Sequence, residues 1–144
     1  MNDLIVKVIT KMLFPFIMVY GFYVMLHGHL SPGGGFSGGA IIGGGFVLFT
    51  LVFGLSKAEA LLPHRYLKYV ESGGLLFYMG IGLFGLFTTG YFLSNQNAGF
   101  YMGEAFTLFS SGMILYITFA IGLKVASTMI TLFRYIIDEE YDHD

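Results

Sequence analysis

Four long runs of apolar residues constrain the fold of this chain more than any other feature. A helix that spans a membrane needs about 20 predominantly apolar residues, because the hydrocarbon layer is about 30 Å thick. The runs fall at residues 4–26, 36–55, 70–93 and 105–133. Only 11% of the 144 residues are charged, against about 25% in a typical soluble domain. The sequence therefore predicts an all-α membrane protein with four transmembrane helices, forming one integral membrane domain over residues 1–144.

The basic residues predict how these helices are oriented. Two lie near the N-terminus, three lie in the loop 57–69 and one follows the fourth run, whereas the loops 27–35 and 94–103 contain no Lys or Arg. Cytoplasmic loops are enriched in Lys and Arg. We therefore expect both termini and the 57–69 loop to be cytoplasmic. The six basic residues of that side are Lys7, Lys11, Lys57, Arg65, Lys68 and Arg134.

Composition excludes several classes of function. The chain has no cysteine, which rules out disulfides, thiol nucleophiles and iron–sulfur ligands. Its net charge of -2 and the lack of a basic run argue against nucleic acid as a partner. The short loops leave no room for a soluble catalytic domain, so we expect neither an enzyme nor a cofactor. The N-terminal run lacks a small-residue cleavage site and is expected to stay as a membrane anchor rather than act as a signal peptide.

A glycine-rich segment, HGHLSPGGGFSGGAIIGGG, occupies residues 27–45 and includes eight of the 21 glycines of the chain within residues 33–45. Serine is a favoured N-cap and proline suits the first helical turn, so Ser31 and Pro32 predict a helix start. Each glycine inside a helix costs about 1 kcal/mol relative to alanine. In a membrane, the usual compensation is the close approach of another helix backbone.

The spacing of these glycines predicts a packing face. Gly35, Gly39 and Gly43 are four residues apart, which puts them on one side of a helix that is nearly bare of side chains. The alternative is a helix N-terminus whose free N–H groups point at an anion, a carboxylate or water. Neither a Gly-Lys-Ser/Thr sequence nor a preceding strand is present, so phosphate-loop and dinucleotide motifs are excluded. The predicted packing residues are Pro32, Gly34, Gly35, Gly38, Gly39 and Gly43.

Ionisable residues near or within the spans are candidates for an ion path, because charge at membrane depth is costly. Glu71 begins the third span beside Lys68, where a structural ion pair is the simpler role. Glu104 begins the fourth span at its outer end. One role for it is to stabilise the helix dipole, as an acid in the first turn does. The alternative is that it pairs with His29 or with a cation that enters from outside. His27 and His29 are two residues apart with no carboxylate near them in the sequence, which is a weak metal signal. We expect at least one of these histidines to hydrogen-bond a loop carbonyl, and we predict no metal site.

Lys124 is the deepest candidate. It lies about 15 Å along a helix from Arg134, at a rise of 1.5 Å per residue. If the span ends near Ala126, the lysine can extend its amine to the interface. If the span continues to Phe133, the lysine is buried and needs a counter-charge, either from Glu71 or from a carboxylate of another subunit. A role in relaying protons stays open in that case.

Residues 27–39, HGHLSPGGGFSGG, resemble the G-H-x-x-P-G-G-G-F-x-G-G motif of the B subunit of Mrp-type, or Mnh-type, sodium/proton antiporters. The length and the four spans are similar too. A related motif occurs in the large A subunit and in membrane-bound hydrogenase-type complexes, and the isolated four-span chain favours the B subunit.

The resemblance implies a small subunit of a multisubunit complex in the bacterial inner membrane, which exchanges internal sodium for external protons. The implied partners are the large A subunit, neighbouring small subunits and membrane lipid, and the implied transported ions are sodium and protons. The main proton paths belong to other subunits, so this chain would contribute helix packing and part of an ion path. Its glycine face would then contact a partner subunit.

Two other functions compete with this interpretation. The first is a structural or lipid-binding scaffold subunit of a hydrogenase-type or complex I-like assembly. The second is a small homo-oligomeric channel, which predicts a polar stripe along one helix. The sequence has instead a polar cluster at one outer end, within residues 88–96, so the channel is disfavoured.

Overall fold

The computed structural model describes residues 4–30, 33–94 and 112–141, with side chains up to residue 138. The described residues form helices and no strands: α1 (Leu4–Leu26), α2 (Gly34–Phe53), α3 (Leu55–Leu61), α4 (His64–Thr89) and α5 (Met113–Tyr141). All of these except α3 are long and apolar enough to cross a membrane. The predicted all-α fold with four transmembrane helices is confirmed.

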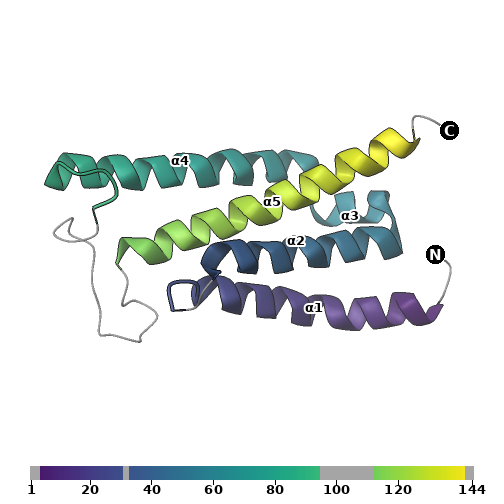
Figure 1. Ribbon diagram of the computed structural model, residues 1–144. Helices are drawn as coiled ribbons and strands as arrows, with labels where there is room; N and C mark the ends of the chain where they lie inside the picture. Colours follow the sequence, from purple (N-terminus) through teal and green to yellow (C-terminus); the bar gives the residue numbers. More distant parts are fainter. Residues whose placement is uncertain (1–3, 31–32, 95–111, 142–144) are drawn as a thin grey trace.

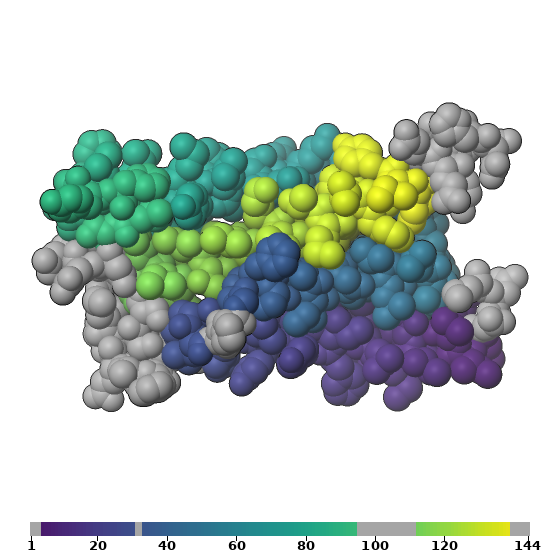
Figure 2. Space-filling view, in the orientation of Figure 1, coloured from purple at the N-terminus to yellow at the C-terminus, as the bar shows by residue number. Residues whose placement is uncertain are grey.

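The long helices lie side by side in the order α1, α2, α5 and α4 (Figure 1). Helix α2 packs against both α1 and α5, and α5 also packs against α4. Helices α1 and α4 therefore form opposite edges of the bundle (Figure 2). Helix α1 begins and α5 ends at the same end of the bundle, where α3 also lies (Figure 1). The basic residues predict that this α3 end is cytoplasmic, and that orientation stays a prediction.

The core lies where α1, α2 and α5 meet. Met25, Ile42 and Ala126 are buried there, and Met25 is completely inaccessible. Phe14 of α1 packs edge-on against Phe46 of α2, with 5.3 Å between the ring centroids. Most other large apolar side chains of the long helices face outward, as expected where lipid or another subunit replaces water.

Helix α2 begins at a glycine rather than at the predicted Ser-Pro step. Gly33 occupies the N-cap position with a φ of 105°, a conformation that side chains with a Cβ rarely adopt. It makes no side-chain capping hydrogen bond, and the helix starts at Gly34. Ser31 and Pro32 lie outside the described residues.

The predicted loop at 57–69 is wrong, because most of it is helical. Helix α2 ends at Phe53, Gly54 turns the chain with a φ of 90°, and the short helix α3 follows. Pro63 then immediately precedes α4, which begins at His64 rather than at residue 70. Charged residues mark the membrane surface, and a helix continues through that surface as long as its backbone hydrogen bonds are kept.

The helix found here, α5, does not coincide with the predicted fourth span at 105–133, whose bounds in the membrane stay a prediction. Gly112 has a φ of 54° and stands outside the helix, which begins at Met113. The helix continues past Phe133 to Tyr141. Residues 105–111 of the predicted span lie outside the described residues. Lys124 is therefore far from either end of α5, and this helix does not end near Ala126.

Candidate functional site

The glycine face of α2 meets a glycine of α5. A Cβ on Gly35 would overlap the backbone carbonyl oxygen of Thr118 in α5, and a Cβ on Gly39 would overlap that of Gly122. A Cβ on Gly122 would in turn lie 2.9 Å from the carbonyl oxygen of Gly35. The two helix backbones thus approach closely because neither carries a side chain at the crossing, as small residues allow between membrane helices.

The remaining predicted packing residues with a described structure also contact other parts of this same chain. A Cβ on Gly38 would lie 2.7 Å from the backbone nitrogen of Met25 in α1, and one on Gly43 would lie 2.9 Å from Cβ of Met129 in α5. A Cβ on Gly34 would lie 3.0 Å from the carbonyl oxygen of Gly28. The expectation that a partner subunit covers this face is wrong, because α1 and α5 already occupy it. Pro32 lies outside the described residues.

The two histidines lie at the end of the bundle opposite α3. His27 Nδ1 is 3.0 Å from the carbonyl oxygen of Tyr23, one turn back in α1, and its ring lies 4.2 Å from the ring of Tyr23. His29 is half-buried in the turn that follows. Among the described residues, no group of three or more His, Cys, Asp or Glu side chains could hold a metal ion. Glu104, the predicted partner of His29, lies outside the described residues.

Hydroxyl groups tie α4 to α5 near the α3 end. Thr128 Oγ1 donates a hydrogen bond to Glu71 Oε1 at 3.0 Å, and the buried Ser127 Oγ donates to the carbonyl oxygen of Leu67 at 2.7 Å. Among the described residues, Glu71 forms no ion pair with Lys68 or with Lys124. The expected boundary pair with Lys68 is therefore wrong, because Thr128 on the facing helix holds the carboxylate instead.

We expect Thr128→Val to weaken the contact between α4 and α5. Valine keeps the shape of threonine but leaves the Glu71 carboxylate without its donor, and hydrogen bonds to charged groups contribute about 1.5–3 kcal/mol. The free energy of unfolding of the purified chain in detergent measures this loss. Thr88→Val is the matched control, since Thr88 bonds only to carbonyl oxygens of its own helix. Equal losses in the two variants would contradict a specific role for the Glu71 bond.

Lys124 lies half-buried beside α4. A Cβ on Gly74 would lie 3.4 Å from Lys124 Cβ, and the lysine lines a shallow hollow between the two helices. The hollow is bordered by Gly74, Leu75, Tyr78, Ala120, Ile121 and Lys124, which we call the Lys124 groove. Within the described part of the chain, Lys124 makes no hydrogen bond or ion pair.

Sequence reasoning missed the role of Arg134. Its side chain is only 3% exposed, and Nη2 donates to the carbonyl oxygens of Leu62 at 2.8 Å and Ala58 at 3.3 Å. Arg134 thereby joins α5 to the C-terminal end of α3. Arg134 lies on the same face of α5 as the buried Ile130 and Ser127, four and seven residues before it, but the sequence alone does not show that this face is covered.

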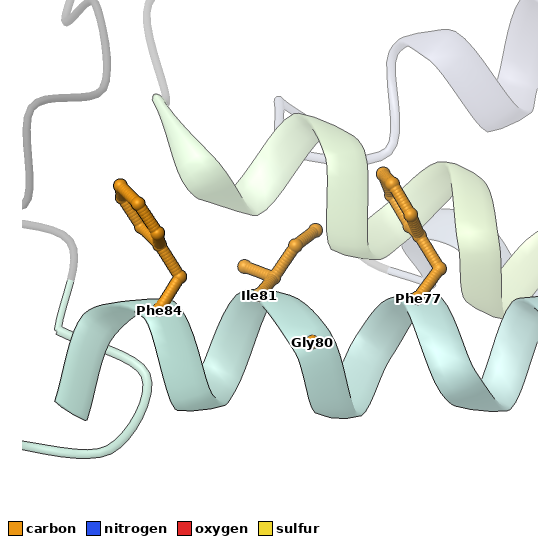
Figure 3. A pocket seen from close by; sticks show the side chains of 4 residues that line it. All are labelled: Phe77, Gly80, Ile81 and Phe84. Carbon is orange, nitrogen blue, oxygen red and sulfur yellow. The ribbon is translucent and has the colours of Figure 1, made fainter. Parts of the chain in front are cut away.

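Helix α4 carries a second hollow, which is apolar. Phe77 and Phe84 rise from α4 on either side of the bare Gly80, and Ile81 stands between them (Figure 3). A Cβ on Gly80 would meet nothing within 4 Å. None of the four residues that line the hollow has a polar side chain, so these side chains provide no group that could bind an ion or transfer a proton.

Residues 5–131 match the protein family described as the domain related to the MnhB subunit of Na+/H+ antiporters. The chain belongs to this MnhB-related family. The match covers all four long helices in whole or in large part and confirms the resemblance found in residues 27–39.

Relatives of this MnhB-related chain include a bacterial antiporter subunit and a longer archaeal protein. The B subunit of the Na(+)/H(+) antiporter of Bacillus subtilis is 41% identical over 85 residues, which are 58% of this chain and 59% of that protein. An uncharacterised protein of Methanocaldococcus jannaschii is 34% identical over 134 residues, which are 88% of this chain and 49% of that protein. The chain thus spans about half the length of the curated relatives it matches.

A solved structure shares the fold of this MnhB-related chain. One chain of the membrane-bound sulfane sulfur reductase, an archaeal respiratory membrane complex, superposes with a TM-score of 0.73 at 34% identity. The similarity covers 90% of this chain and 55% of that chain. The family fold therefore occurs in a respiratory complex as well as in proteins named as antiporter subunits.

Proposed function

We propose that this chain is a small subunit of a hetero-oligomeric cation/proton antiporter of the cell membrane, which exchanges internal sodium for external protons. The proposal is supported by membership of the MnhB-related family and by the antiporter subunit among its relatives. Its partners would be the other subunits of that complex, including the large A subunit. The chain would act in transport and assembly and not as an enzyme.

The scarcity of ionisable side chains within the described long helices supports the role of a subunit over that of a self-sufficient antiporter. Glu71 of α4 accepts a hydrogen bond from Thr128, and Lys124, one helical turn before Thr128 in α5, makes no ion pair among the described residues. A complete proton path would need a chain of such groups from one end of the bundle to the other. These two residues do not form one, which favours a subunit that supports a path built by its partners. The ion-path roles of Lys124, Glu71, Glu104, His29 and His27 stay predictions.

A second function has a specific observation in its favour. The solved relative belongs to a respiratory membrane complex, so this chain could serve as a scaffold subunit in a redox-driven assembly instead. The two candidates differ in the subunits that surround the chain.

Purification of the tagged chain from its native membrane separates the two functions. We expect antiporter subunits to co-purify, and we expect a strain that lacks the chain to lose growth at high sodium and to lose sodium/proton exchange in membrane vesicles. Restoration by the unsubstituted gene is the control. Co-purification of iron–sulfur or other redox subunits with unchanged sodium tolerance would instead establish the scaffold function.

A further inference from the structure

The Lys124 groove lies on an exposed face of the α4–α5 pair. Its floor consists of the small residues Gly74 and Ala120, and its walls include Leu75, whose side chain is 50% exposed, and Ile121. Small residues at the floor of a groove let another helix backbone approach closely within a membrane. The groove therefore has the shape and the apolar walls that suit a helix.

Lys124 adds a charge to this face at the middle of the span. By length and composition, Met113–Asp138 is the part of α5 that could cross a membrane, and Lys124 lies about 16 Å and about 21 Å from its two ends along the helix axis. A lysine at that depth is costly and usually faces protein and pairs with an opposite charge. Lipid phosphates lie at the surfaces of a hydrocarbon layer about 30 Å thick, so they are far from this position.

No acid of the described chain provides the counter-charge. Glu71 is the acidic residue of α4, and its carboxylate accepts the hydrogen bond from Thr128 without pairing with Lys124. The other acids with described side chains, Glu59 and Asp138, belong to α3 and to the last turns of α5, away from mid-span. The charge of Lys124 is therefore left for a group outside these residues.

We propose that the Lys124 groove binds a transmembrane helix of a neighbouring subunit, and that this helix carries an Asp or Glu that pairs with Lys124. Charge complementarity at mid-membrane selects a carboxylate on a helix, because a lipid tail has no charge and a lipid phosphate lies too far away. This inference rests on the proposed function, because it requires that the chain belongs to a complex with other membrane subunits.

Photo-cross-linking in native membranes tests the position of the partner. A benzoylphenylalanine at Leu75 or at Ile121 is expected to capture one other subunit, and the cross-linked peptide is expected to be a transmembrane segment with an Asp or Glu within one turn of the captured residue. The control position is Leu76, also on α4, which is 69% exposed and does not line the groove. We expect capture there to be at least fivefold weaker.

Substitution of Lys124 tests the charge. Lys124→Met is expected to lower capture from Leu75 at least tenfold, because the partner carboxylate then lacks its counter-charge, whereas Lys124→Arg is expected to keep most of it. Lys68→Met removes an exposed lysine at the α3 end of α4 and is the matched control. The amount of Lys124→Met chain in the membrane is measured in parallel and is expected to be unchanged, because methionine suits an apolar environment.

Three outcomes would overturn the inference. The first is capture of lipid alone from Leu75 and Ile121, and the second is unchanged capture in Lys124→Met. The third is an equal loss in Glu71→Gln with no further loss in the double variant, which would make Glu71 the counter-charge. If other subunits co-purify with the unsubstituted chain while any of these occurs, the proposed function survives and this inference fails. If no other subunit co-purifies, both fail.

Discussion

Gly39→Leu is expected to abolish the native packing of α2 against α5, and Gly39→Ala to destabilise it measurably. A single methyl group at Gly39 already overlaps the carbonyl oxygen of Gly122 and would lie 2.9 Å from Cβ of Val125. The carbonyl belongs to the backbone of α5 and cannot rotate away as the end of a side chain can. Overpacking a well-packed interior typically costs about 1–3 kcal/mol, and leucine adds three more carbon atoms at the same point.

Gly44→Ala provides the control for this prediction. Gly44 lies in the same helix, is exposed, and a Cβ there would meet nothing within 4 Å. We expect this variant to be at least as stable as the original, because alanine is favoured over glycine in a helix by about 1 kcal/mol. The unfolding free energies of both alanine variants in detergent give the comparison. If Gly39→Ala proved as stable as Gly44→Ala, the close backbone contact between α2 and α5 would be wrong.

The repeat of glycines at every fourth position shows what the sequence could predict. It requires a helix face without side chains, and the structure places backbone against that face at Gly35 and Gly39. The identity of the neighbour was not accessible, because spacing describes one helix and not the element that packs on it. The facing residues Thr118, Gly122 and Ala126 are also spaced four apart, a weaker form of the same small-residue pattern that was not used.

Hydropathy predicted the number of spans better than the ends of the helices. Apolar runs report membrane depth, whereas helix ends depend on local backbone features such as Gly54 and Pro63, which bound α3. Helix α3 was missed because its seven residues LSKAEAL are too short and too polar to register as a span. In the sequence, Arg134 served only as one of the basic residues that indicate the cytoplasmic side, because a basic residue after an apolar run ordinarily remains in water. Its burial depends on α3, which the sequence did not reveal.

Arg134→Met is expected to release α3 from α5 while changing the global stability of the chain little. Methionine keeps much of the side-chain volume but removes the donor that binds the carbonyl oxygens of Leu62 and Ala58. Hydrogen bonds from a charged donor contribute about 1.5–3 kcal/mol. Burial of a guanidinium whose Nε and Nη1 lack partners among the described residues is costly, and the substitution removes this cost. The lost hydrogen bonds and the removed cost therefore offset each other in the free energy of unfolding.

The local loss is expected to appear in hydrogen exchange. The amides of Ala58 and Leu62 bond to the carbonyl oxygens of Gly54 and Ala58 within α3, and a local loss of about 1.5–3 kcal/mol corresponds to exchange about 10 to 150 times faster. Mass spectrometry of peptides that cover residues 54–63 measures this rate. Arg65→Met is the matched control, because it removes one positive charge from the same end of the bundle at an exposed position. Equal acceleration in both variants would mean that charge at this end, and not the contact of Arg134 with the C-terminus of α3, holds the short helix in place.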